Sequence, residues 1–316
     1  MRKNLYSAIR PYVQISRPDH WFKNVFVVPG IVLAVFDDRT LLAWGMMPKI
    51  ALAAISVCLV ASSNYVINEI LDSEMDRQHP VKRNRPIPSG AVDLRIAYAE
   101  WVALGISGLL VGSLVNRGVF ASSLLLLVMG ILYNMPPVRL KDIAYLDVLS
   151  ESVNNPIRFT LGWFAAGSRN VIMISLLMSY WMLGAFLMAV KRYAEYTFID
   201  SKEVAVRYRK SFSYYDKNRL MSSIIYYATA FGLFSGIFIV RYHIELIISV
   251  PLVAGFMSYY LHIGFYENSP VQYPEKLYTV KPFLFFTMFT FLFIVLLLFI
   301  DIRSMEVFFN QFLKTR

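Results

Sequence analysis

The chain has 316 residues, of which 57% are hydrophobic and 16% are charged. A soluble domain usually carries about 25% charged residues, and the mean hydropathy here is +0.51, so the composition excludes an ordinary soluble protein. The single cysteine, Cys58, excludes a disulfide framework and a cysteine metal cluster. The net charge of +10 is divided among short loops between apolar segments, which argues against binding to nucleic acid.

Long uncharged runs account for the missing charges. The clearest run begins at Pro282 and ends at Ile300; about 20 apolar residues suffice to cross a bilayer as a helix, and the run is too long for an ordinary strand. We therefore predict an all-α, polytopic membrane bundle of about nine transmembrane helices, forming a single domain over residues 1–316. The approximate cores are residues 25–36, 50–70, 96–114, 119–133, 148–166, 171–190, 220–240, 244–265 and 282–300.

The basic residues predict the orientation of these spans. Nine spans place the termini on opposite sides. The N-terminal side carries 22 Lys and Arg residues, the other side carries eight, and Arg158 lies within a span. Because cytoplasmic loops carry the excess of Lys and Arg, we expect an inner (cytoplasmic) membrane protein whose N-terminus and long loops face the cytoplasm. No apolar run closely follows the first basic residues, so no cleavable signal peptide is expected.

A polar stripe ends the second predicted span. Asn64, Asn68, Asp72 and Asp76 recur every four residues, which places them on one helix face over about 18 Å. Two aspartates one turn apart are natural ligands for Mg²⁺, which prefers oxygen ligands, waters and substrate phosphates. The alternative is a solvated helix end, but it leaves two asparagines within a span unexplained.

A basic segment follows this stripe directly. Cations beside a metal site suit a polyphosphate ligand, and the alternative is an ordinary positively charged cytoplasmic loop. Its members are Arg77, His79, Lys82, Arg83 and Arg85.

The fifth predicted span carries a second polar stripe. Ionisable groups inside a span are costly and usually face the interior of a bundle or a water-filled cavity. Pro156 is expected to open the helix locally. A structural pair of Glu151 and Arg158 is the alternative to a functional role. The stripe consists of Asp147, Glu151, Asn154 or Asn155, and Arg158.

If the second and fifth spans pack together, carboxylates from both would surround one cavity at the cytoplasmic surface. Mg²⁺ between them would orient and partly neutralise phosphates, and a diphosphate leaving group is stabilised in this way. A lipid tail would lie in the apolar bundle beside the cavity. These residues predict an enzyme that handles a phosphorylated lipid.

The acidic motifs resemble those of the UbiA superfamily of intramembrane prenyltransferases. One is N-x-x-x-D-x-x-x-D at Asn68, Asp72 and Asp76, and the other is Asp147-x-x-x-Glu151. The resemblance implies a UbiA-like bundle of nine helices, with a cytoplasm-facing, Mg²⁺-dependent site and a lateral opening to lipid.

Four further segments resemble the decaprenyl-phosphate phosphoribosyltransferase subfamily. They are RPDHWFKN at 17–24, DRQHPVKRNRPIPSG at 76–90, RLKDIAYLD at 139–147 and KRYAEY at 191–196. The resemblance implies a phosphorylated donor, phosphoribosyl diphosphate, and a polyprenyl phosphate acceptor. Diphosphate leaves C1 of the ribose, and the acceptor phosphate is already ionised at neutral pH, so no general base is required.

The resemblance also implies roles for individual residues. Asn68, Asp72 and Asp76 would hold Mg²⁺ and the donor diphosphate, with Asp72, Asp76 and Asp147 as the catalytic carboxylates. Lys82, Arg83 and Arg85 would hold donor phosphates, Lys23 and Lys141 would face the acceptor phosphate, and Lys191 and Arg192 would line the same surface. The remaining candidates for substrate binding are Asn64, Tyr133, Glu151, Asn154 and Arg158.

Two other functions remain open. The segment YNMPPVRLK at 133–141 resembles prenyltransferases that act on aromatic or other ring acceptors. A transporter would also place charged groups inside spans, although its usual paired half-repeats are not evident. The expected partners are a polyprenyl lipid, a phosphorylated donor and membrane lipids, with no nucleic acid; the sequence does not predict an oligomeric state.

Overall fold

A computed structural model describes residues 5–77, 82–199 and 201–302. These residues form helices and connecting turns, without a strand among them. The chain divides into two compact units, residues 1–170 and 171–316, which are described separately. That the whole chain acts as a single domain stays a prediction.

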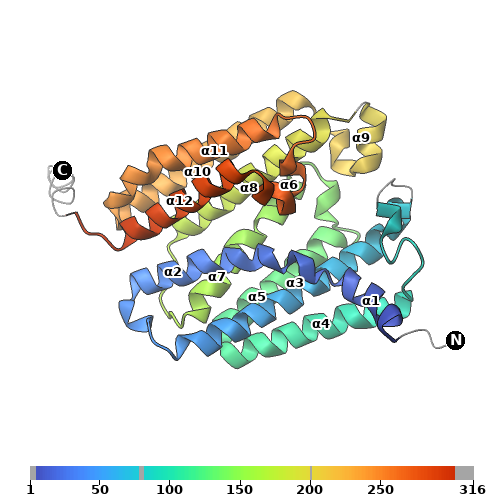
Figure 1. The fold of residues 1–316 in the computed structure, drawn as a ribbon, viewed down its shortest axis with the longest axis horizontal. Helices are drawn as coiled ribbons and strands as arrows, with labels where there is room; N and C mark the ends of the chain where they lie inside the picture. The colour runs from blue at the N-terminus through green and yellow to red at the C-terminus, as the bar shows by residue number, and fades with distance from the viewer. Residues whose placement is uncertain (1–4, 78–81, 200, 303–316) are drawn as a thin grey trace. The chain divides into compact units, whose positions relative to one another are not determined.

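The described residues of the first unit form seven α-helices, which Figure 1 shows. They are α1 (Leu5–Ile15), α2 (Val28–Asp37), α3 (Met46–Arg77), α4 (Leu94–Val115), α5 (Arg117–Asn134), α6 (Leu146–Ser152) and α7 (Asn154–Ala165). Short 3₁₀ segments connect them: η1 (Pro18–Val27), η2 (Arg39–Leu41), η3 (Lys82–Asn84) and η4 (Leu140–Asp142). The long helix α3 packs against α4 and α5, and α7 packs against α2 and α5.

In the second unit, the part of the chain that the structure describes forms five α-helices. They are α8 (Ile174–Thr197), α9 (Lys202–Tyr208), α10 (Lys217–Tyr242), α11 (Val250–Gly264) and α12 (Lys281–Leu298). Its 3₁₀ segments are η5 (Lys210–Ser213), η6 (Ile244–Ser249), η7 (Pro270–Gln272) and η8 (Pro274–Thr279). Within this unit α8 packs against α10, and α11 packs against α12.

Eight helical stretches in the described part of the chain are long and apolar enough to cross a membrane. Two of them combine several elements: Ala8–Asp37 includes most of α1 with η1 and α2, and Ile244–Gly264 joins η6 to α11. The eight stretches match eight of the nine predicted spans.

The remaining predicted span, the fifth along the chain at residues 148–166, is divided into α6 and α7 by a turn at Val153. Pro156 has no N–H to donate to the carbonyl of Ser152, so one bond of the helical ladder is missing here, although Val153 still donates to Leu149 and Ile157 to Val153. The expected local opening of this helix is confirmed.

The outward faces of the long helices are apolar, as a lipid environment requires. On α4, Ile106, Leu110 and Leu114 are all more than half exposed. The interior of the first unit is also apolar: Val57 and Val60 of α3, Leu126 of α5 and Leu161 of α7 belong to one buried cluster. In lipid the apolar faces gain nothing by leaving their surroundings, so close packing and hydrogen bonds between helices stabilise the bundle.

Two glycines allow close contact between α7 and the segment formed by η1 and α2. A Cβ atom on Gly30 would collide with the carbonyl oxygen of Phe159, and one on Gly162 would collide with the carbonyl oxygen of Val27. Small residues are typical of helix contacts in membranes because they let two backbones approach. This contact fixes the position of α7. Helix α7 comes directly after α6 in the chain, and α6 carries part of the second polar stripe.

Candidate active site

The first predicted stripe lies on α3, which continues unbroken to Arg77. Asp76 is buried, whereas Asn68 and Asp72 are partly buried. Asn64 packs against Gly130 of α5, where a Cβ would collide with its amide, and its side chain donates to the carbonyl of Leu126 at 2.9 Å. Asn64 therefore helps to join α3 to α5.

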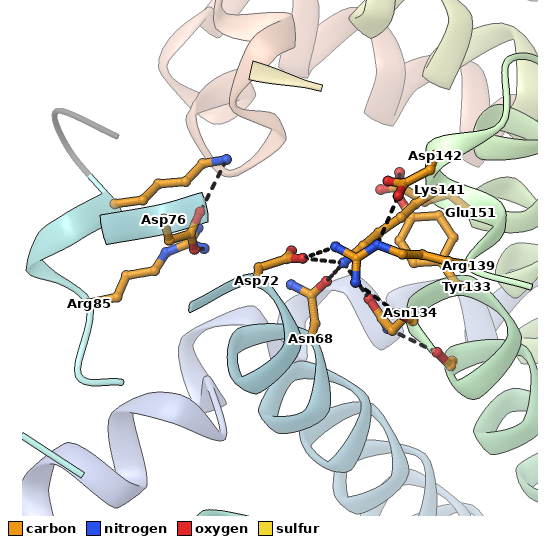
Figure 2. Close-up of polar contacts among 12 residues, drawn as sticks. Asn68, Asp72, Asp76, Arg85, Tyr133, Asn134, Arg139, Lys141, Asp142 and Glu151 are labelled. Atoms are coloured by element: carbon orange, nitrogen blue, oxygen red, sulfur yellow. Dashed lines mark hydrogen bonds and ion pairs between the residues drawn. The ribbon is translucent and has the colours of Figure 1, made fainter. Parts of the chain in front are cut away.

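Asp72 is the centre of a cationic cluster at the C-terminal end of α3 (Figure 2). Its Oδ1 accepts from Nζ of Lys141 and from Nη2 of Arg139, both at 2.7 Å. The Lys141 ammonium also donates to Oδ1 of Asn68 at 3.0 Å and to Oδ1 of Asn134 at 2.9 Å. Hydrogen bonds between charged groups are the stronger kind, so this cluster fixes the segment after α5 against α3.

Arg139 is held on three sides within this cluster. Besides its bond to Asp72, its Nε donates to Oδ2 of Asp142 at 3.0 Å and its Nη1 donates to the carbonyl of Asn134 at 3.2 Å. Its backbone is left-handed, with φ of 33°, a conformation that is costly for a residue with a side chain. Strained residues of this kind gather at functional sites, where the surrounding structure holds them.

Asp76 meets a different pair of cations. Nη1 of Arg85 donates to its Oδ2 at 2.6 Å, and Nζ of Lys82 lies 3.8 Å from its Oδ1. Figure 2 shows Asp72 and Asp76 facing these two separate sets of cations. Arg83 of the same basic segment is exposed, and His79 lies outside the described residues. The basic segment thus folds back onto the end of α3.

The second stripe begins beside the Asp72 cluster. Tyr133, at the end of α5, donates to Oε2 of Glu151 on α6 at 3.1 Å, and its ring centroid lies 6.0 Å from Nζ of Lys141. Asp147 lies one turn before Glu151 on α6 and is fully buried. Tyr133 therefore connects α6 with the Lys141 cluster, while the convergence of Asp72 and Asp147 on one metal stays a prediction.

The remaining candidates of the first unit lie along η1 and α7. Nε of Arg158 donates to Oδ1 of Asn24 at 2.9 Å, and its Nη1 donates to the carbonyl of Asn154 at 3.3 Å. Nζ of Lys23 lies 2.9 Å from Nδ1 of His20 and 6.0 Å from the ring centroid of Tyr65. Arg158 is thus tied to η1, and Lys23 lies beside α3.

Lys191 and Arg192 belong to the second unit, at the C-terminal end of α8. Arg192 is fully buried and its Nη1 donates to Oε2 of Glu195 at 3.0 Å, while Nζ of Lys191 lies 4.0 Å from Oε1 of the same carboxylate. The negative charge of Glu195 and burial raise the pKa of Tyr208 on α9. That Lys191 and Arg192 line the same surface as Asp72 stays a prediction.

The donor atoms around Asp72 suit a hard cation. Among the described residues, no three His, Cys, Asp or Glu side chains come close enough to hold a metal by themselves. However, oxygens of Asn68, Asp72 and Asn134 all lie within 3.0 Å of one cationic nitrogen. Mg²⁺ needs only one or two carboxylates, with waters and substrate phosphates as its other ligands. The oxygen set therefore fits Mg²⁺ in combination with a phosphorylated substrate.

Three residues of this region were not among the predicted site residues. Arg139 and Asn134 both contact the Asp72 cluster, and Glu69, buried on α3, accepts from the backbone N–H of Ile87 at 3.1 Å. Arg139 lies two residues before Lys141, in segments quoted above for their resemblance to known families, and this was the available signal. Asn134 and Glu69 carry no comparable signal, because their contacts, with Lys141 and with Ile87, depend on how the chain turns between the two partners.

Comparisons with known proteins agree with this architecture. A solved UbiA homologue from Archaeoglobus fulgidus, described as bound to GPP and Mg²⁺, superposes with a TM-score of 0.69 over 92% of this chain and 100% of that one. The two sequences are 18% identical, so the likeness shows the fold.

Sequence relatives agree as well. The decaprenyl-phosphate phosphoribosyltransferase of Mycolicibacterium smegmatis is 32% identical over 221 residues, covering 69% of this chain and 65% of that protein. The protein of the same name from Mycobacterium tuberculosis (strain CDC 1551 / Oshkosh) is 30% identical over 195 residues, covering 62% and 63%. The match therefore spans somewhat less than two thirds of these relatives. The profile of the UbiA prenyltransferase family matches residues 25–287, and the chain belongs to this family.

Proposed function

We propose that this protein is a membrane transferase that moves a phosphoribosyl group from phosphoribosyl diphosphate to a polyprenyl phosphate, with release of diphosphate. The observation that carries the proposal is the contact of Asp72 with Lys141 and Arg139, which gathers carboxylate and cations at the end of α3. Relatives about 30% identical carry the name of this activity. Such a mixed cluster suits a ligand that brings both phosphates and a metal ion.

The reaction breaks the bond between C1 of the ribose and the oxygen of the diphosphate, and the bonding electron pair leaves with the diphosphate. An oxygen of the lipid phosphate then forms the new bond to C1. Because that phosphate is ionised at neutral pH, it needs no base to remove a proton. The main task of the protein is to orient the two substrates and to stabilise the departing negative charge.

The proposed roles follow from where the side chains lie. We assign Arg139, which lies at Asp72, and Arg85 and Lys82, which lie at Asp76, to the phosphates of the donor. Asn68, Asp72 and Asp76 would hold Mg²⁺, which would supply charge neutralisation of the diphosphate. Lys23 and Lys141 are assigned to the acceptor phosphate. The site is proposed to face the cytoplasm, because the basic loops lie on that side of the predicted topology.

A direct assay tests the proposal. Purified protein is incubated with Mg²⁺, phosphoribosyl diphosphate labelled in the ribose, and a polyprenyl phosphate, and the lipid extract is examined for label. Labelled lipid together with an equal amount of diphosphate is expected. A lipid extract that stays unlabelled while the protein is folded would refute this donor and acceptor pair.

Two further assays distinguish the alternatives. Prenyl transfer to a ring would release diphosphate only when a prenyl diphosphate and an aromatic acceptor are supplied together. A transporter would move a phosphorylated substrate across reconstituted vesicles without changing it. Neither outcome is expected for this protein.

A further inference from the structure

The ammonium of Lys141 already occupies the position of a bound cation. It donates to three side-chain oxygens, those of Asn68, Asp72 and Asn134, at 3.0, 2.7 and 2.9 Å. A lysine ammonium has three N–H donors, so all of them are used. Lys141 is also 7% exposed, and its position is therefore enclosed.

Two of these three oxygens are candidate metal ligands. Asn68 and Asp72 lie one turn apart on α3, and each turns its Oδ1 toward Lys141. A divalent ion would bind these oxygens at about 2.0–2.1 Å, so it would have to occupy the volume that the ammonium now fills. Oδ1 of Asp72 already accepts from both Arg139 and Lys141 at 2.7 Å. A divalent ion on the same oxygen would be a third cation, so charge repulsion adds to the steric conflict and one of the two side chains would have to leave.

The surroundings allow Lys141 to leave without dismantling the cluster. Arg139 keeps its bond to Asp72 and is anchored separately by Asp142 and by the carbonyl of Asn134. Lysine carries a compact charge on a flexible stem, so its head can move while the backbone stays in place. Arg139 has a rigid fork and is the fixed member of the pair.

We propose that Lys141 is a resident counter-ion that competes with a divalent cation for Asn68 and Asp72. When the metal enters, the ammonium leaves these oxygens and becomes available to an anionic ligand. This inference rests on the proposed metal-dependent function, and it adds an ordered coupling between metal binding and a substrate-binding lysine.

Metal binding without any substrate tests the competition. Mg²⁺ and Mn²⁺ affinities are measured by calorimetry for the wild type and for Lys141→Met. We expect at least a tenfold tighter dissociation constant in the variant, because the oxygens are no longer occupied by an ammonium. An unchanged or weaker affinity would overturn the proposal and would indicate that Lys141 holds the ligands in place.

Two control variants separate competition from the general effect of removing a positive charge. Lys49→Met changes an exposed lysine on α3 itself, 23 residues before Asp72 and about 35 Å away at 1.5 Å per residue. Arg83→Met changes an exposed cation of the neighbouring basic segment. Both should keep the affinity of the wild type within about threefold. An equal gain in Arg83→Met would show a general field effect and refute the competition.

A second measurement uses the wild-type protein and therefore does not depend on whether a variant folds. Reductive methylation of lysines is followed by mass spectrometry with and without Mg²⁺. We expect Mg²⁺ to increase methylation of Lys141 several-fold and to leave Lys49 unchanged. Protection of Lys141 that persists at saturating metal would contradict the displacement.

These results can be told apart from failure of the proposed function. If neither the wild type nor Lys141→Met binds a divalent cation, both the competition and the proposed metal site are wrong. If the competition is observed but no phosphoribosyl transfer occurs, the assignment of substrates fails while the inference about Lys141 holds.

Discussion

Arg85 and Asp76 form the shortest ion pair at the end of α3, with Nη1 of the arginine 2.6 Å from Oδ2 of the carboxylate. The pair joins the basic segment after α3 to the last acidic residue of the helix, although nine residues separate them in the sequence. Because Asp76 is buried, this contact is both a structural restraint and a source of positive charge beside the proposed phosphate site.

Replacing Arg85 by methionine tests both roles. It would leave the buried Asp76 carboxylate with Lys82, whose Nζ lies 3.8 Å from Oδ1. Loss of one partner of a buried hydrogen bond costs about 1–3 kcal/mol. We expect a lower melting temperature and a higher KM for the phosphorylated donor. Arg83→Met is the stability control, since Arg83 is exposed; an equally large loss of stability there would contradict the assignment.

Asp72→Asn and Asp76→Asn should each lower kcat by about a hundredfold or more, which corresponds to roughly 3 kcal/mol in the activation barrier. Asparagine keeps the shape of the side chain but removes the charge that Mg²⁺ and the neighbouring cations require. Turnover is measured with Mg²⁺ at saturating substrate, and the melting temperature reports on folding.

The matched control for these two variants is Glu74→Gln, which removes the same charge from an exposed position of α3 between the two aspartates. It should retain nearly full activity. Normal turnover in Asp72→Asn or Asp76→Asn would contradict their proposed role as metal ligands.

Tyr133→Phe removes the hydrogen bond from the phenol to Glu151 and leaves the ring in place. A typical hydrogen bond contributes about 0.5–1.5 kcal/mol to stability, and we expect a loss of this size, measured as a shift in thermal unfolding in detergent. Tyr278→Phe, at an exposed tyrosine, serves as the control and should be neutral. A neutral Tyr133→Phe would show that this bond does not fix α6.

Gly30→Ala should be strongly destabilising, by more than about 2 kcal/mol, because the new Cβ would collide with the backbone carbonyl of Phe159 on α7. Backbone cannot rotate away as a side chain can, so α2 and α7 would have to separate. Gly232→Ala on α10 is the control, since a Cβ there meets open space. Similar melting temperatures for the two variants would refute the close helix contact.

The fold and part of the site could be predicted from the sequence because their signals are local. The length and apolarity of each span depend on its own residues, and eight of the nine spans were found as predicted. The stripe of Asn68, Asp72 and Asp76 follows from the helical repeat alone, and α3 carries it without interruption. The break near Pro156 was also predictable, because a missing N–H acts within one helical turn.

The partners of these residues required the tertiary structure. Asp72 meets Lys141 across 69 residues of sequence and Arg139 across 67, and the backbone at Arg139 is left-handed. Asn134 enters the same cluster by its position at the end of α5. A sequence pattern predicts which side chains share one helix face. Ion pairing between distant side chains depends on how the helices pack and how the connecting segments turn. For this reason the sequence alone predicted the chemistry of the α3 stripe, and the packing of α3 against α5 decided which cations Asp72 meets.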